Sequence, residues 1–204
     1  MEWNTFPSLR RLYISKLTFG RTFSLPSTLV ELRFHKCIIG SDCDLVRLNE
    51  LNPILPELRS LILSETDMRI HTVRKFLAAT PSLELMHING CLSGVINQRP
   101  VGLNFGSFLN LVELDVSRTA LLRDSSFPGL IIGLTNLKVL KLSHTQITRD
   151  TVKMFADHRE MNDNYPSLDH LYVEGCEGVS LDSAMYAEDR GIEVHKSTYM
   201  HTEQ

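Results

Sequence analysis

The sequence predicts an α/β solenoid, a coil of repeated units whose short strands stack into one parallel sheet of about eight strands. Three observations support this fold class. A nine-residue leucine pattern recurs along the chain, apolar and polar side chains alternate inside each copy, and the longer segments between the copies are either helical or irregular in character. We therefore expect a curved molecule with a concave sheet and a mixed helical and irregular convex side.

The repeated pattern is clearest in "LKVLKLSHT", which has the form L-x-x-L-x-L-x-x-T and starts at Leu137. Six other segments fit it, with Thr, Cys or Leu in the last position. The copies start at Leu9, Leu29, Leu58, Leu83, Leu111, Leu137 and Leu168. A final strand without the rest of the unit is predicted at 191–197. Seven matches within 204 residues indicate one structural unit used repeatedly, so we predict a single domain over residues 1–204.

The alternation inside each copy predicts where every strand side chain points. Successive side chains of a strand face opposite sides, so Leu140 and Leu142 should point inward while Lys141 and Ser143 point outward. One unit cannot bury its apolar side alone, and stacking the units creates a continuous core. The return segments are longer than the strands, so the coil should curve with the sheet on its concave side.

The last position of each copy is expected to be an inward-facing side chain. It is occupied by Leu17, Cys37, Thr66, Cys91, Thr119, Thr145 and Cys176. The hydroxyls and thiols should bond to neighbouring backbone groups. Buried free thiols are common, so this slot explains three of the four cysteines. The fourth, Cys43, has no spacing typical of a zinc site.

Helices are predicted for several return segments, from apolar residues spaced along one helical face. The segments are 70–81, 150–161, 43–55 and 181–190, the last of which should end at Gly191. The expected inward residues are Val73, Phe76 and Leu77 in the first, and Val152, Phe155 and Ala156 in the second. They are Leu45 and Leu48 in the third, and Ala184, Met185 and either Ala187 or Glu188 in the fourth. The segments 18–28 and 93–107 should be irregular, and 124–134 mixed.

On these copies the chain resembles leucine-rich-repeat (LRR) proteins over residues 6–197, which implies a horseshoe-shaped solenoid. Cys or Thr in the last position is similar to the intracellular classes, the cysteine-containing repeats of F-box proteins and the ribonuclease-inhibitor-like repeats. "LSHTQITRDTVKMFA" with "LYVEGCEGVSLDSAMYAEDRGIEV" resembles the C-terminal repeats of F-box/LRR proteins. Those proteins recruit substrates to ubiquitin ligases, so the resemblance implies a substrate-recognition domain.

Other roles stay open at this stage. The chain enters its first repeat without a capping unit, so we expect a fragment or one part of a larger protein or complex. No F-box precedes the repeats, so any ligase adaptor would be bound through a further segment. A structural or assembly subunit is one alternative. "FPSLRRLYI" and "LPSTLVELRFHKC" resemble the LRR domains of plant nucleotide-binding immune receptors instead, which is the other alternative.

Composition and motifs argue against several function classes. The net charge of −3 gives no overall attraction to nucleic acid, and the apolar runs are far shorter than the roughly 20 residues of a membrane span. Phosphate-binding, zinc-protease and nucleophile-elbow motifs are absent. We expect no catalytic residue, cofactor or metal. The free cysteines and the missing signal-peptide pattern favour an intracellular setting.

The outward positions of the strands are the expected binding surface for a protein partner. Aromatic and arginine side chains, which are enriched at interface hot spots, recur in the central outward column. That column consists of Tyr13, Arg33, Ile62, His87, Asp115, Lys141 and Tyr172. Charge is uneven as well: residues 1–40 hold six Lys/Arg and two acids, whereas residues 165–204 hold two and eight. A partner of opposite polarity is therefore favoured.

Overall fold

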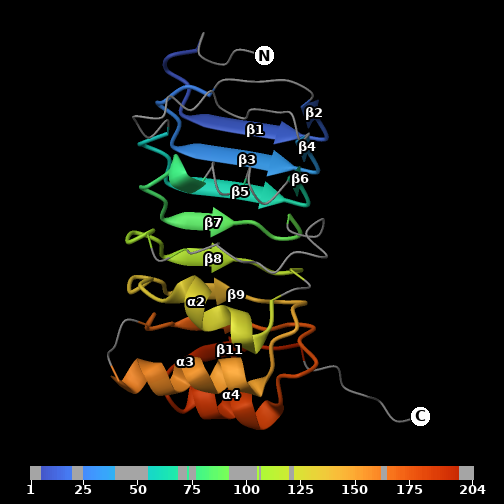
Figure 1. Ribbon diagram of the computed structural model, residues 1–204, viewed down its shortest axis with the longest axis vertical. Coiled ribbons are helices and arrows are strands. Elements are labelled where there is room, and N and C mark those ends of the chain that lie inside the picture. Colours follow the sequence, from blue (N-terminus) through green and yellow to red (C-terminus); the bar gives the residue numbers. More distant parts are fainter. Residues whose placement is uncertain are drawn as a thin grey trace, which may run out of the picture.

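A computed structural model of the chain describes residues 6–19, 25–39, 55–68, 73, 77–91, 105, 107–119, 122–161 and 165–197. Its main feature is an eight-stranded parallel sheet in which the strands follow one another in chain order (Figure 1). The strands are β1 (Arg11–Ser15), β3 (Glu31–His35), β5 (Ser60–Ser64), β7 (Leu85–His87), β8 (Glu113–Asp115), β9 (Val139–Lys141), β10 (His170–Tyr172) and β11 (Glu193–His195). This is the predicted LRR solenoid.

The predicted repeats are in the predicted register. Seven of the strands begin two residues after the leucine that starts each copy, and the eighth lies within 191–197. The inward positions pair along the sheet, as Leu114 with Leu140 and Leu140 with Leu171. All three side chains are buried in one continuous apolar core. The stacking of repeats therefore supplies the core that no single repeat could form.

A second, narrow parallel sheet lies just beyond the main strands and was not predicted. It consists of β2 (Thr18–Phe19), β4 (Ile38–Ile39) and β6 (Asp67–Met68). Its second residues, Phe19, Ile39 and Met68, join the core. In later repeats the same connection is made by single parallel β-bridges, which pair Arg123 with Gln146 and Thr148 with Gly178. In these described parts of the chain, consecutive repeats are thus bonded at two places along their path.

The chain leaves each of the first seven main strands through a residue with left-handed backbone. The position just before the inward-facing slot has a φ between 49° and 66° in all seven copies. Its occupants are Lys16, Lys36, Glu65, Gly90, Arg118, His144 and Gly175. Only two are glycines, although a left-handed conformation costs other residues about 1–2 kcal/mol. Stacking of the repeats evidently outweighs this local cost.

The inward-facing slot is largely buried as predicted, but the predicted bond to backbone fails at Thr119, whose buried hydroxyl has no hydrogen-bond partner among the described residues. Six of its seven side chains are buried, Leu17 being partly exposed. The three thiols contact the preceding repeat: Cys37 donates to the carbonyl of Ile14 at 3.6 Å, Cys91 to that of Leu63, and Cys176 to that of Leu142 at 3.2 Å. Two threonines bond within their own repeat instead, Thr66 to Ser64 and Thr145 to Leu142. The cysteines therefore connect consecutive repeats.

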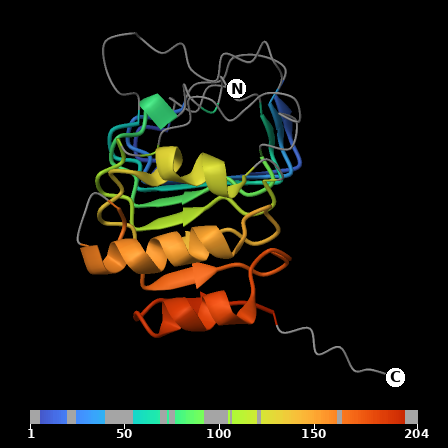
Figure 2. The ribbon, with the colours of Figure 1, turned by 60° about the horizontal axis from the view of Figure 1, so that its bottom comes forward.

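Helices lie on the convex side of the later repeats (Figure 2). They are η3 (Asp124–Ser126), α2 (Phe127–Ile131), α3 (Arg149–Met161) and α4 (Leu181–Glu188), with α3 in contact with α4. The predicted inward residues of α3, Val152, Phe155 and Ala156, are fully buried. None of the helices in the described ranges is long and apolar enough to cross a membrane.

The other helical predictions have mixed outcomes. In α4 the inner face is Ser183, Ala184 and Ala187, whereas Met185 is 53% exposed, so its predicted inward direction is wrong. Gly191 does follow the helix with a φ of 79°. In the segment 70–81 the structure describes helical backbone at 73 and at 77–78, with Val73 and Leu77 buried. Phe76, Leu45 and Leu48 lie outside the described residues, as does Cys43.

Candidate binding surface on the concave sheet

The seven side chains of the central outward column occupy one register position across the sheet. Tyr13 pairs with Arg33, Arg33 with Ile62, and Ile62 with His87. The series continues through Asp115, Lys141 and Tyr172, and ends at His195 on β11. The alignment predicted from the repeats is therefore present, with one further member. The binding role of these residues remains a prediction.

The column differs from expectation at Asp115, whose side chain is only 6% exposed. Its carboxylate accepts a hydrogen bond from the Asn89 amide at 3.0 Å and another from the backbone N–H of Ser117 at 2.9 Å. A short carboxylate can bend back onto nearby backbone donors in this way. Asp115 thus holds the turn after β8 and presents little surface to a partner, so it does not belong to the candidate surface.

The N-terminal part of the surface is organised around Glu31. Its carboxylate accepts from the Tyr13 hydroxyl at 2.8 Å and from the Arg33 Nε at 2.6 Å, with Arg11 3.6 Å away. The Arg33 guanidinium also lies 5.1 Å from the centre of the Tyr13 ring. Partial burial raises the pKa of Glu31, but these hydrogen bonds and charges outweigh it and leave that pKa below its usual value.

A second group, in the middle of the sheet, surrounds Glu113. One of its carboxylate oxygens lies 2.7 Å from Nε2 of His87 and accepts a hydrogen bond from Nζ of Lys141 at 2.6 Å. Burial alone would raise the pKa of Glu113, whereas the bonds from Lys141 and His87 lower it more strongly. The three side chains come from β7, β8 and β9, so this group links three consecutive repeats.

Apolar and aromatic side chains complete the surface between and beyond these groups. Ile62 and Leu85 are half-buried on the outward side of β5 and β7. Nζ of Lys141 lies 5.5 Å from the centre of the Tyr172 ring, and that ring stacks on His195 with centroids 4.0 Å apart and an interplanar angle of 9°. The surface thus offers alternating charged, apolar and aromatic contacts.

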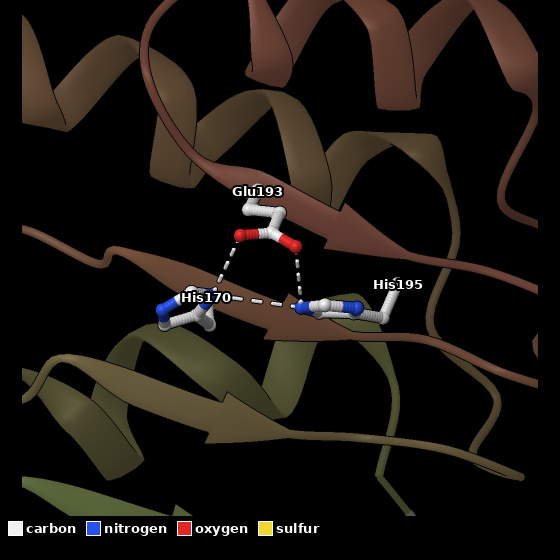
Figure 3. Close-up of side chains that lie close together, drawn as sticks. All are labelled: His170, Glu193 and His195. Atoms are coloured by element: carbon white, nitrogen blue, oxygen red, sulfur yellow. Dashed lines mark hydrogen bonds and ion pairs between the residues drawn. The ribbon is translucent and has the colours of Figure 1, made fainter.

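At the last two strands the structure brings together three side chains that the sequence had not connected. His170 on β10 faces Glu193 and His195 on β11, as Figure 3 shows. The sequence predicts no metal site, because its eight histidines are spread along the chain. The group could have been predicted from the repeats. If the strand within 191–197 has the same register as the others, Glu193 lies beside His170 and His195 beside Tyr172.

The uneven charge of the chain becomes a separation in space. The first and last strands lie at opposite ends of the stack (Figure 1). Exposed Arg11, Lys16 and Lys36 belong to the first repeats, whereas exposed Glu174 and Glu177 belong to the last. The concave surface is therefore more basic toward β1 and more acidic toward β11.

Comparisons with known proteins find only a distant structural likeness. No model of a known family matches the chain, and no curated protein matches it. Among solved structures, the crystal structure of an internalin from Listeria monocytogenes is similar with a TM-score of 0.39 and 12% identity. The match covers 86% of this chain and 66% of that chain, just under two thirds of its length. So loose a likeness carries no argument about function, and the LRR architecture rests on the chain's own repeats and sheet.

Proposed function

We propose that this chain is a non-enzymatic, protein-binding LRR domain that holds its partner on the concave sheet. The observation that carries the proposal is the outward column in which six accessible side chains share one register position. They are Tyr13, Arg33, Ile62, His87, Lys141 and Tyr172, from six different strands. A parallel sheet held by a continuous core presents such a column as a rigid, extended surface.

The chemistry of this column suits protein recognition. Tyrosine and arginine dominate the hot spots of protein interfaces, and the column has both, at Tyr13, Arg33 and Tyr172. Glu31 and Glu113 already hold their neighbours by hydrogen bonds and ion pairs, so little side-chain freedom is lost on binding. The charge separation favours a partner whose acidic part lies toward β1 and whose basic part lies toward β11.

In its finer form the proposal is a substrate-recognition domain of an F-box-type ubiquitin ligase. It is supported by the resemblance of residues 142–156 and 171–194 to the C-terminal repeats of F-box/LRR proteins. The ligase adaptor would bind through a segment outside this chain. The alternatives are a scaffold subunit of a larger complex and the LRR domain of a nucleotide-binding immune receptor.

Affinity capture of the native full-length protein separates these roles. Co-purification of a Skp-type adaptor and a cullin in stoichiometric amounts supports the ligase role. A stable complex that lacks both, with the chain as a fixed subunit, supports the scaffold role. A nucleotide-binding module in the same polypeptide supports the receptor role.

The concave surface itself is tested with truncations that leave the core intact. Arg33→Ala or Tyr172→Ala should weaken binding of the captured partner by about 1–3 kcal/mol, the hot-spot range, without changing the melting temperature. Glu188→Lys is the matched convex control, since Glu188 is exposed at the end of α4. If Glu188→Lys abolishes binding while the two column variants bind normally, the proposed surface is wrong.

A further inference from the structure

We propose that His170, Glu193 and His195 form a binding site for a divalent transition metal, with Zn²⁺ as the preferred ion, at the C-terminal edge of the concave sheet. Their positions follow from the pairing of β10 with β11. His170 lies directly opposite Glu193, and His195 lies opposite Tyr172, one outward position further along. All three side chains therefore leave the same face of two adjacent strands, as Figure 3 shows.

The distances between the donor atoms fit a single ion. Nδ1 of His170 lies 3.2 Å from one carboxylate oxygen of Glu193, and Nε2 of His195 lies 3.4 Å from the other. The two ring nitrogens are 3.5 Å apart. Zinc ligands lie about 2.0–2.1 Å from the metal in a tetrahedron, whose edges then measure about 3.3–3.4 Å. The two distances to Glu193 are to different oxygens of its carboxylate, and one donor atom from each of the three residues lies within 4.8 Å of the others. A small rotation of the side chains would therefore bring three donors onto one face of that tetrahedron.

The donor types select the class of metal. Two imidazole nitrogens and one carboxylate are a ligand set used for zinc and other first-row transition metals, whereas Mg²⁺ and Ca²⁺ prefer oxygen ligands. Three protein ligands leave a further coordination position for water or for a group of a binding partner. Within the described residues no other set of three His, Cys, Asp or Glu side chains converges in this way.

The surroundings hold the ligands in place and favour a cation. The His195 ring stacks on Tyr172, which restricts its rotation. Lys141, the cation on the other side of that tyrosine, is engaged by Glu113 at 2.6 Å. Residues 165–197, the described part of this end, contain seven acids and two Lys/Arg, so the field there is negative. The three ligands are partly exposed, and an ion can therefore reach them directly from solvent.

Without a metal, the same atoms would hold protons instead. Hydrogen bonds to Glu193 explain two of the three short distances, and a proton shared between the rings would explain the third. A metal ion explains all three at once and joins β11, the last strand in the sheet order, to β10. Binding should therefore also raise the melting temperature, a result that a hydrogen-bonded cluster does not give on addition of zinc.

The test is a titration of the full, chelator-treated chain with Zn²⁺, followed by calorimetry and by the melting temperature. We expect one ion per chain, a stabilised fold, and affinity lowered at least about tenfold by His170→Ala, His195→Ala or Glu193→Gln. With Co²⁺ in place of Zn²⁺, the wild-type chain should show the intense visible absorption of a tetrahedral site, and these three variants should not. Mg²⁺ should give neither heat nor stabilisation.

Two control variants sharpen the result. His35→Ala removes an exposed histidine from β3 on the same sheet, and Cys43→Ser removes a thiol that could capture zinc by itself. Both should bind Zn²⁺ like the wild type. The proposal is overturned if the double variant His170→Ala/His195→Ala, shown to be folded by circular dichroism, binds Zn²⁺ as tightly as the wild type. It is equally overturned if the wild type binds no Zn²⁺.

Discussion

The His144 imidazole occupies the space into which a side chain at Gly175 would extend. A Cβ atom built on Gly175 would overlap the Nδ1 and Cε1 atoms of this ring. The two residues hold the same left-handed position in consecutive repeats, with φ values of 58° and 66°. The ring of one repeat thus covers the turn of the next.

This contact predicts unequal effects of two chemically identical substitutions. Gly90 has the same φ as Gly175, but a Cβ there would meet its nearest neighbour at 3.8 Å. Gly90→Ala should therefore lower the free energy of unfolding by about 1–2 kcal/mol, the cost of a left-handed conformation for a residue with a side chain. Gly175→Ala should cost more than that, because His144 must also move. Urea unfolding of both variants measures the difference.

A double variant identifies the source of that difference. In a His144→Ala background the ring is gone, so Gly175→Ala should lower the free energy of unfolding only as much as Gly90→Ala does in the wild type. If the two glycine variants are equally stable, the overlap with His144 has no energetic consequence and the prediction fails.

Leu140 should be among the most sensitive core positions. It is fully buried on β9 between Leu114 and Leu171, so Leu140→Ala should leave a cavity and destabilise the fold by about 2–5 kcal/mol. Val112→Ala is the control, because Val112 is 44% exposed and its loss should cost below about 1 kcal/mol. A loss at Leu140 as small as at Val112, by urea unfolding, would contradict the inward register of β9.

The three slot cysteines should be unreactive in the folded chain. Burial raises the pKa of the Cys91 thiol from 9.0 to about 12, and the thiolate is the reactive form. In a Cys43→Ser background, thiol labelling at pH 8 should be slow for Cys37, Cys91 and Cys176 and become fast in denaturant. Rapid labelling of the folded chain, or a disulfide between any two, would contradict their burial.

Asp124 should make the stability of the chain depend on pH in the acid range. Its carboxylate accepts from the backbone N–H of Thr148 at 2.8 Å and from the hydroxyls of Thr148 and Thr151 at 2.7 and 2.5 Å. Thr148 in turn caps α3 by accepting from the N–H of Asp150 at 3.2 Å. Asp124 therefore fastens the start of α3 to the preceding repeat.

The direction of the pH effect follows from the pKa. Burial raises the pKa of Asp124, but its hydrogen bonds outweigh this and leave it below the ordinary 3.8. The stabilisation is then present above pH 3.8 and is lost as the pH falls through the lowered folded-state pKa. Asp124→Ala should cost about 1–3 kcal/mol at pH 7 and clearly less at pH 2–3.

The control for this prediction is Asp182→Ala. Asp182 is an exposed carboxylate in the first turn of α4, and its loss should change stability by below about 0.5 kcal/mol at either pH. Urea unfolding at the two pH values compares the variants. If Asp124→Ala lowers the free energy of unfolding equally at both pH values, the charged form of Asp124 does not add to stability and the prediction is wrong.

Local spacing along the chain was enough to predict the main strands, the direction of their side chains and the buried face of α3. A strand side chain alternates with a period of two and a helical one with a period of 3.6, so both directions can be predicted from local spacing. This is why Leu140 and Val152 are buried as expected and why Tyr13 and Lys141 share one column. Where the spacing was ambiguous, at Met185, the prediction failed.

Local spacing could not predict which side chains meet across strands. The burial of Asp115 depends on Asn89 in the preceding repeat, and the left-handed turn at His144 is accepted because the stacked repeats impose it. The group of His170, Glu193 and His195 depends on the register of β10 against β11, from segments more than 20 residues apart. Local spacing sets the direction of a side chain, whereas distances between side chains on different strands are set by pairing and packing.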